Sequence, residues 1–178
     1  TNIYSNEVIW SGANGGGMYI SGSSTVVTIS NSVIHSNEAT NGGGGGGMLI
    51  SGGTVTVTDT NIYSNSASQG GGIYIWGVST SVSFDGCNIH DNIAAWTGGG
   101  MFVTLLDRIY LTSSIFTNNI AGNNEASAIY FEGPAGDSLL SNCTFAGHPS
   151  EATMIVAVKA LKWHCPLGTY MPQSGVFQ

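Results

Sequence analysis

The sequence predicts an all-β solenoid, a right-handed parallel β-helix in which short strands stack coil upon coil. Three observations predict this fold. Similar segments recur every ~27 to 31 residues, apolar residues within each segment alternate with a period of two, and Gly, Asn and Ser separate the apolar stretches. A β-sandwich is the alternative, but it would not require the same residue types to recur column by column.

The first column of the repeat is an apolar residue that is followed three positions later by asparagine. It recurs as Ile3 with Asn6, Ile34 with Asn37, Ile62 with Asn65, Ile89 with Asn92, and Phe116 with Asn119. A second apolar column stands five residues earlier, and most of its members have another apolar residue two positions before them. Its members are Ile29, Val57, Phe84, Leu111 and Leu140. This alternation is typical of a half-buried strand.

The third column is a glycine-rich run that leads into an apolar triplet. The triplets are 18–20, 48–50, 73–75 and 101–103, and 129–131 follows without a glycine before it. Each repeat therefore offers three short strands. Because strands this short cannot bury a face alone, we expect successive repeats to pair in parallel about 4.8 Å apart.

The pattern also divides the chain. Residues 151–157 repeat the pattern of 125–131, so we expect about six coils, roughly 30 Å of solenoid, over residues 1–158. Residues 1–6 are identical to residues 60–65, which indicates that the chain starts in mid-repeat and is a fragment of a longer one. Residues 159–178 change in character, and we expect a cap or junction there and the start of a cysteine-rich segment.

Charged residues are scarce. They make up 7% of the 178 residues, against about 25% in a typical soluble domain, and the net charge is -7. The cations are Arg108, Lys159 and Lys162, so nucleic acid is excluded as a partner. No run of about 18 apolar residues is present, so no membrane span is predicted in this segment.

The motif GGGM or GGGI, with a later F-x-x-N, resembles the repeats of chlamydial polymorphic outer-membrane proteins and of related secreted β-helix proteins. The resemblance covers residues 1 to about 158. The GGA[ILV] element of that family is matched with Gly in place of Ala, and its Phe stands only at Phe116 and Phe145. The resemblance implies an adhesin-like or structural β-helix outside the cell or on its surface, and it implies no enzyme.

Three cysteines and one glycosylation motif bear on the compartment. Cys87 and Cys143 share one column with the Ser114 coil between them, about 10 Å apart, which is too far for a disulfide. Cys165 begins Cys-Pro-Leu-Gly-Thr-Tyr, which resembles the opening of ephrin-receptor-like cysteine-rich repeats. That resemblance implies a disulfide from Cys165 to a downstream segment in an oxidising compartment. Asn142 begins the single N-glycosylation sequon and falls on a predicted turn, so it is a candidate glycan site.

Catalytic residues are not predicted. Uronate lyases need cations for the substrate carboxylate, and the predicted solenoid supplies only Arg108. Glycoside hydrolases need two converging carboxylates, for which Asp59 and Asp85 are the best pair. Asn31 and Asn142 occupy the same turn as Asp59, however, which favours a turn-forming role.

Neither a metal nor another cofactor is predicted. His35 and His90 share one outward column, but Tyr63 lies between them and places them about two coils, roughly 10 Å, apart. Asp85 and Asp91 leave calcium binding open.

The asparagine column has a structural explanation. An inward asparagine at the end of a strand can bond to the turn and to its equivalents one coil away. We therefore expect a structural ladder of Asn6, Asn37, Asn65, Asn92 and Asn119.

An outward column is the candidate contact surface. Strand alternation places the middle residue of each glycine-led triplet on the outer face. The resulting ladder is Tyr19, Leu49, Tyr74, Phe102 and Tyr130, a stripe suited to another solenoid or to sugar rings. The sequence thus predicts a non-enzymatic extracellular structural or adhesive solenoid that associates with itself, with another surface protein or with glycans. The alternative is a carbohydrate-binding module, or a polysaccharide lyase or hydrolase of pectin-lyase-like architecture.

Overall fold

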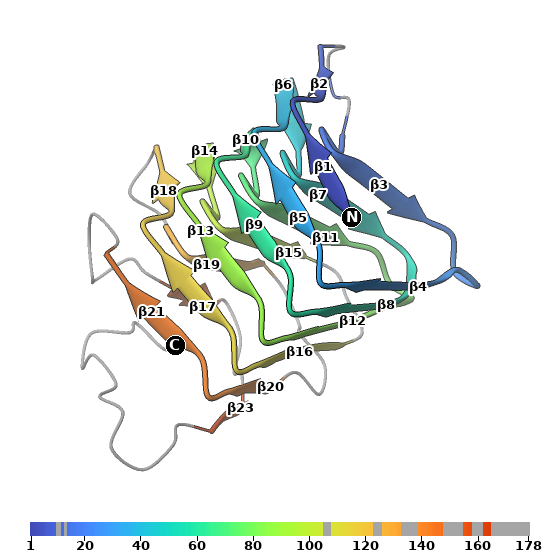
Figure 1. Ribbon diagram of the computed structural model, residues 1–178, viewed down its shortest axis with the longest axis vertical. Coiled ribbons are helices and arrows are strands. Elements are labelled where there is room, and N and C mark those ends of the chain that lie inside the picture. Colours follow the sequence, from blue (N-terminus) through green and yellow to red (C-terminus); the bar gives the residue numbers. More distant parts are fainter. Residues whose placement is uncertain are drawn as a thin grey trace.

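A computed structural model describes residues 1–9, 12, 14–104, 108–122, 126–132, 139–147, 155–157 and 162–164. These residues form strands and turns and contain no helix. Strands of neighbouring coils pair in parallel, as the stacked arrows of Figure 1 show. The predicted all-β parallel solenoid is therefore confirmed.

The strands form four parallel sheets. Sheet A contains β1 (Asn2–Tyr4), β5 (Val33–His35), β9 (Asn61–Tyr63), β13 (Asn88–His90), β17 (Ile115–Thr117) and β21 (Thr144–Ala146). Sheet B contains β2 (Glu7–Val8), β6 (Glu38–Gly44), β10 (Ser66–Gln69), β14 (Ile93–Thr97) and β18 (Ile120–Ala121). Sheet C contains β3 (Met18–Ser21), β7 (Met48–Ser51), β11 (Ile73–Trp76), β15 (Met101–Thr104), β19 (Ile129–Glu132) and β22 (Ile155–Ala157). Sheet D contains β4 (Val26–Ser30), β8 (Gly53–Thr58), β12 (Thr80–Asp85), β16 (Arg108–Thr112), β20 (Leu139–Ser141) and β23 (Lys162–His164).

Each complete coil has four strands, so the prediction of three strands was wrong. The described strands make five complete coils, β1 to β20, and continue as β21 to β23 of a sixth. The additional strand in each coil belongs to sheet B and follows the asparagine column. Its inward residues are mostly alanines, namely Ala39, Ala67, Ala94 and Ala121. Because alanine is small and only weakly apolar, a strand with inward alanines shows little alternation of apolar and polar residues. Its sequence therefore resembles that of a turn.

The corners of each coil use left-handed backbone conformations. Asp59 and Asn142 turn the chain from sheet D into sheet A with φ of 48° and 54°, and Asp91 turns it from sheet A into sheet B with φ of 53°. Asn and Asp tolerate this conformation better than other non-glycine residues do. The Asn- and Ser-rich segments of the sequence therefore form the corners that they predict.

The glycine-rich run allows close packing between sheets B and C. A Cβ atom on Gly71 would collide with the backbone of Ile93 and with the carbonyl oxygen of Gly99. One coil later, a Cβ atom on Gly99 would likewise collide with the backbone of Ile120. Only glycine fits where two backbones approach this closely, which explains why the run recurs in successive coils.

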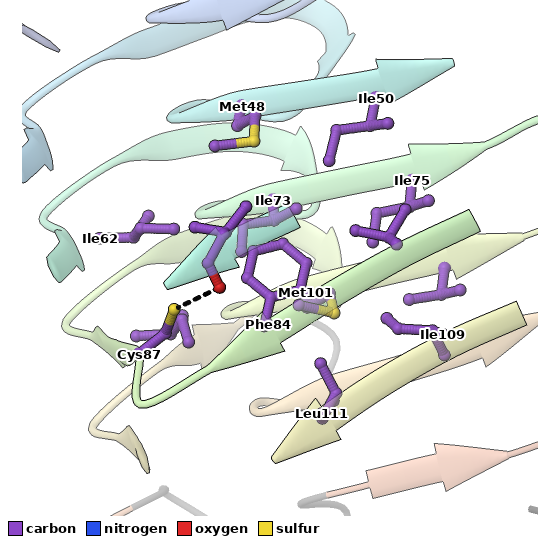
Figure 2. Close-up of a cluster of buried hydrophobic side chains, with 14 of the residues drawn as sticks. Met48, Ile50, Ile62, Ile73, Ile75, Phe84, Cys87, Met101, Ile109 and Leu111 are labelled. Carbon is purple, nitrogen blue, oxygen red and sulfur yellow. Dashed lines mark hydrogen bonds between the residues drawn. The ribbon is translucent and has the colours of Figure 1, made fainter. Parts of the chain in front are cut away.

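The interior is a continuous apolar core. The predicted columns are aligned in register, for example Ile62 with Ile89 in sheet A and Val57 with Phe84 in sheet D. Figure 2 shows Phe84 and Cys87 among the side chains of this buried cluster. Cys87 donates a hydrogen bond to the carbonyl oxygen of Val57 over 3.5 Å.

Sheet pairing continues across the predicted division of the chain. Strand β23 still pairs with β20, with Leu140 aligned to Trp163, so sheet pairing runs past residue 158. The junction and the cysteine-rich segment predicted for residues 159–178 lie largely outside the described residues, and that division stays a prediction.

Candidate functional site

The inward asparagines form a ladder of hydrogen bonds along the solenoid. Asn92 donates from Nδ2 to Oδ1 of Asn119 and to the carbonyl oxygen of Ile62, both over 3.0 Å. Its own Oδ1 accepts from the backbone N and from Nδ2 of Asn65. The same pattern joins Asn37 to Asn65, and the exposed Asn6 to Asn37. These amides bond to the protein itself, so their role is structural.

The two described cysteines belong to a column of small polar residues. Cys87 donates to the carbonyl oxygen of Asp85, as Thr60 and Ser114 donate to the carbonyl oxygens two residues before them. Cys87 and Cys143 are not bonded to each other. Burial raises the pKa of Cys87 to about 11, although two backbone contacts favour the thiolate. The thiol of Cys87 is therefore protonated and unreactive near neutral pH.

The predicted contact ladder is aligned in register on the outer face of sheet C. It is not exposed throughout, so the prediction was wrong for two of its members. Leu49 is 0% and Phe102 is 2% exposed, whereas Tyr19 is 56% exposed. The rings of Phe102 and Tyr74 make a T-shaped contact at a centroid distance of 4.9 Å, and Phe102 stacks on Tyr130 at 5.3 Å.

Neighbouring rings and sheet B explain this burial. The Tyr74 ring lies against the end of β6, so close that a Cβ atom on Gly44 would collide with it. Burial raises the pKa of Tyr74, and the negative charge of Glu132 raises it further. Strand alternation correctly predicted which residues point outward from sheet C, but it carries no information about another strand folding against them.

A second outward column, on sheet A, is a stack of four rings. Tyr4, His35, Tyr63 and His90 follow one another at centroid distances of 5.2, 4.9 and 4.9 Å, with interplanar angles of 3°, 3° and 6°. His35 and His90 are thus two coils apart with Tyr63 between them, the arrangement that the sequence predicts. The sequence analysis did not recognise the stack, although the column of rings after the core isoleucine signals it.

These histidines have partners within the protein. His90 contacts Oδ2 of Asp91 through Nδ1 at 2.6 Å and Oδ1 of Asn61 through Nε2 at 3.0 Å. Within the ranges that the structure describes, no three His, Cys, Asp or Glu side chains gather as a metal site would require.

The comparison with protein families agrees with this geometry. The family model described as "right handed beta helix region" matches residues 1–160. The chain belongs to this right-handed β-helix family. Searches of curated proteins and of solved structures gave no match.

In this β-helix, the two aspartates weighed as a catalytic pair have structural contacts. Asp59 occupies a corner, and Asp85 is aligned with Thr58, one residue before that corner. Asp85 accepts a hydrogen bond of 2.6 Å from Thr112 one coil later. The Asp85 carboxylate therefore takes part in coil pairing, and Asp59 forms a corner through its backbone conformation and its backbone N, which donates to the carbonyl oxygen of Asp85.

The outer face of sheet B carries an apolar patch that the sequence analysis missed. Ile93 and Ile120 are neighbours in register, 49% and 42% exposed, and Trp96 on the same strand as Ile93 is 50% exposed. We call Ile93 and Ile120 the sheet B patch. The column begins with two exposed glutamates, Glu7 and Glu38, which are also paired in register. Each residue of this outward column directly follows a column asparagine in the sequence. That position does not indicate an exposed surface unless sheet B has already been recognised.

Two further sites concern modification. Asn142 is exposed at its corner, which makes its sequon accessible on the surface of the β-helix. Cys165 lies outside the described residues, and its downstream disulfide stays a prediction. The described residues include no helix with the length and apolar character needed to cross a bilayer.

Proposed function

We propose that this β-helix is a non-enzymatic structural or adhesive module of an extracellular or cell-surface assembly, and that it associates with copies of itself through the sheet B patch. The observation that carries the proposal is the pairing of Ile93 with Ile120, both about half exposed, on the outer face of sheet B. Scattered exposed apolar residues are normal on protein surfaces, whereas a contiguous group indicates a contact.

The patch is compatible with a weak contact. Covering Ile93 and Ile120 on two copies would remove on the order of 300 Å² of apolar surface, well below the ~1,200 Å² of a standard stable interface. Weak contacts suffice in an assembly that repeats them, because linked contacts reinforce one another.

The charge pattern of sheet B favours a two-fold arrangement. If two copies lay side by side in the same direction and register, Glu7 and Glu38 of one would face those of the other. A two-fold axis near the patch instead places Ile93 and Ile120 of one copy on those of the other, and it separates the glutamates. The net charge of -7 opposes either arrangement, and salt screens that repulsion.

Other features support a location outside the cell. The exposed sequon at Asn142 is accessible to a glycan, and the GGGM and F-x-x-N motifs resemble adhesin-like surface repeats. The Cys165 segment resembles the start of a disulfide-rich repeat, which requires an oxidising compartment. The structural contacts of Asp59 and Asp85 support the non-enzymatic part of the proposal.

Sedimentation velocity tests the association. We expect the weight-average sedimentation coefficient of the 178-residue chain to rise with protein concentration, and to rise more in high salt than in low salt. A coefficient that stays at the monomer value in both buffers would contradict self-association. A coefficient that falls when salt is added would show a contact made by charges rather than by the patch.

A further inference from the structure

A second feature of the outer surface lies on sheet C, away from the patch. Ser21 is aligned with Ser51, and Trp76 is aligned with Thr104; Ile50 and Ile75, the inward residues directly before Ser51 and Trp76, are aligned as well, so we infer one outward column of Ser21, Ser51, Trp76 and Thr104. Trp76 is 43% exposed. Its neighbours in this column are Ser51 one coil before it and Thr104 one coil after it, both small and polar.

Tyr19 reaches into the same region. It belongs to the adjacent outward column, yet its hydroxyl group accepts a hydrogen bond of 3.1 Å from Oγ of Ser51. This bond draws the Tyr19 ring toward Ser51, whose next neighbour along the column is Trp76. Two exposed aromatic residues, Tyr19 one coil before Ser51 and Trp76 one coil after it, therefore flank the Ser51 position along the solenoid.

The two rings differ from the other aromatic columns in what they offer. In the sheet A stack, rings cover each other face to face, so the column presents mainly ring edges. Trp76 is aligned with Thr104 on one side, and on the other side Ser51 follows Ile50, the partner of Ile75, so no aromatic residue adjoins Trp76 in this column. An uncovered indole face suits the apolar face of a sugar ring, and nearby hydroxyl groups suit its polar edge.

Charge selects among sugars. The described residues of this column and of the adjacent ladder carry a single ionisable carboxylate, Glu132, and no cation. A uronate or sulfated sugar would approach an acidic chain with no counter-charge at the site, whereas a neutral sugar meets no such penalty.

We propose that Tyr19, Ser51 and Trp76 form a binding site for a neutral polysaccharide, with sugar rings stacked on Trp76 and Tyr19 and hydrogen bonded to the Ser51 and Tyr19 hydroxyls. This site is separate from the sheet B patch, and it requires no self-association. It gives the β-helix a means to attach to a neutral glycan matrix.

Affinity electrophoresis tests the site with soluble neutral polysaccharides (a mixed-linkage β-glucan, a xyloglucan and a galactomannan) and with polygalacturonate as the acidic comparison. We expect at least one neutral glycan to retard the chain, and Trp76→Ala to weaken this binding about tenfold or more. Trp96→Ala is the matched control, because Trp96 is similarly exposed but lies on sheet B. Its affinity should stay within about twofold of the unmodified chain.

Further variants separate stacking from hydrogen bonding. Tyr19→Phe keeps the ring and removes the hydroxyl, so we expect a smaller loss than for Tyr19→Ala. Thermal unfolding checks that each variant keeps the fold. The proposal is overturned if no neutral glycan in the panel retards the chain, if polygalacturonate binds more tightly, or if Trp96→Ala loses as much affinity as Trp76→Ala. Sedimentation of the same variants reports on the sheet B patch separately.

Discussion

Asn92 donates two hydrogen bonds to Oδ1 of Asn119, which lies 27 residues later in the chain, one from its backbone N at 3.1 Å and one from its Nδ2 at 3.0 Å. One amide oxygen thus fixes both the corner and the side chain of the coil before it. Repeating this contact coil by coil sets the register of the solenoid. The exposed patches on sheets B and C depend on that register, because it brings residues of different coils together.

Replacing Asn92 by Ala should destabilise the chain by about 3 kcal/mol, because it removes four hydrogen bonds of the buried side chain, to the carbonyl oxygen of Ile62, to Oδ1 of Asn119, and from the backbone N and Nδ2 of Asn65. Asn6→Ala is the matched control, since Asn6 stands in the same column but is exposed. Its loss should be well under 1 kcal/mol. Urea unfolding measures both values, and equal losses would contradict the role of burial in the ladder.

Cys87 should resist thiol reagents in the folded chain and react after unfolding. Its pKa is raised to about 11 from 9.0, so the unfolded state releases the proton first as pH rises. The corresponding stability is present below about pH 9 and is lost toward pH 11, a change of roughly 2 to 3 kcal/mol.

Cys87→Ser provides the comparison for that pH dependence. Ser and Thr occupy the same column at Ser114 and Thr60, so the variant should fold normally. Thermal melting from pH 8 to 11 should show a steeper loss for the unmodified chain than for Cys87→Ser. Parallel curves would show that the buried thiol does not contribute to the alkaline loss.

Gly71→Ala should disrupt folding, because the added Cβ atom meets the backbone of Ile93 and of Gly99, which cannot move without separating the coils. We expect a loss above about 3 kcal/mol or an insoluble product. Gly42→Ala is the control. Gly42 has a φ of 88° but open space around its Cβ position, so only backbone strain of about 1 to 2 kcal/mol is expected. Similar losses in urea unfolding would show that close packing does not explain the glycine-rich run.

Phe102→Ser should cost about 3 to 5 kcal/mol, although Phe102 lies on the outward side of its strand. It is buried and contacts the rings of Tyr74 and Tyr130. Tyr19→Ser, in the same column, should cost under about 1 kcal/mol because Tyr19 is exposed. If Phe102→Ser unfolds at the same urea concentration as the unmodified chain, the contacts of Phe102 do not stabilise the fold.

The sequence predicted the fold because its strongest signals are also its structural determinants. Ile62, Asn65 and Gly72 each repeat at a fixed position, since the coil interior, the corner and the close backbone contact each accept few residue types. Sheet B escaped prediction because its inward alanines are small. Periodicity also placed Phe102 on the outer face, but burial there depends on neighbouring rings that only the register brings together.

The candidate surfaces were harder to predict than the fold. Ile93 and Ile120 are 27 residues apart in the sequence and become neighbours only when β14 pairs with β18. The bond from Ser51 to Tyr19 joins two columns diagonally, which no column-by-column pattern represents. Strand pairing decided the first case, and side-chain direction beyond the strand alternation decided the second.

The central claim is that this β-helix associates through the sheet B patch, and one comparison of variants by sedimentation velocity tests it most directly. Ile93→Ser combined with Ile120→Ser removes the paired isoleucines. Ile115→Ser removes an isoleucine of similar exposure that stands between Asn88 and Thr144 in sheet A. We expect the double variant to remain monomeric at concentrations where the unmodified chain and Ile115→Ser associate. If the double variant associates as strongly as Ile115→Ser does, the sheet B patch is not the contact and the claim is wrong.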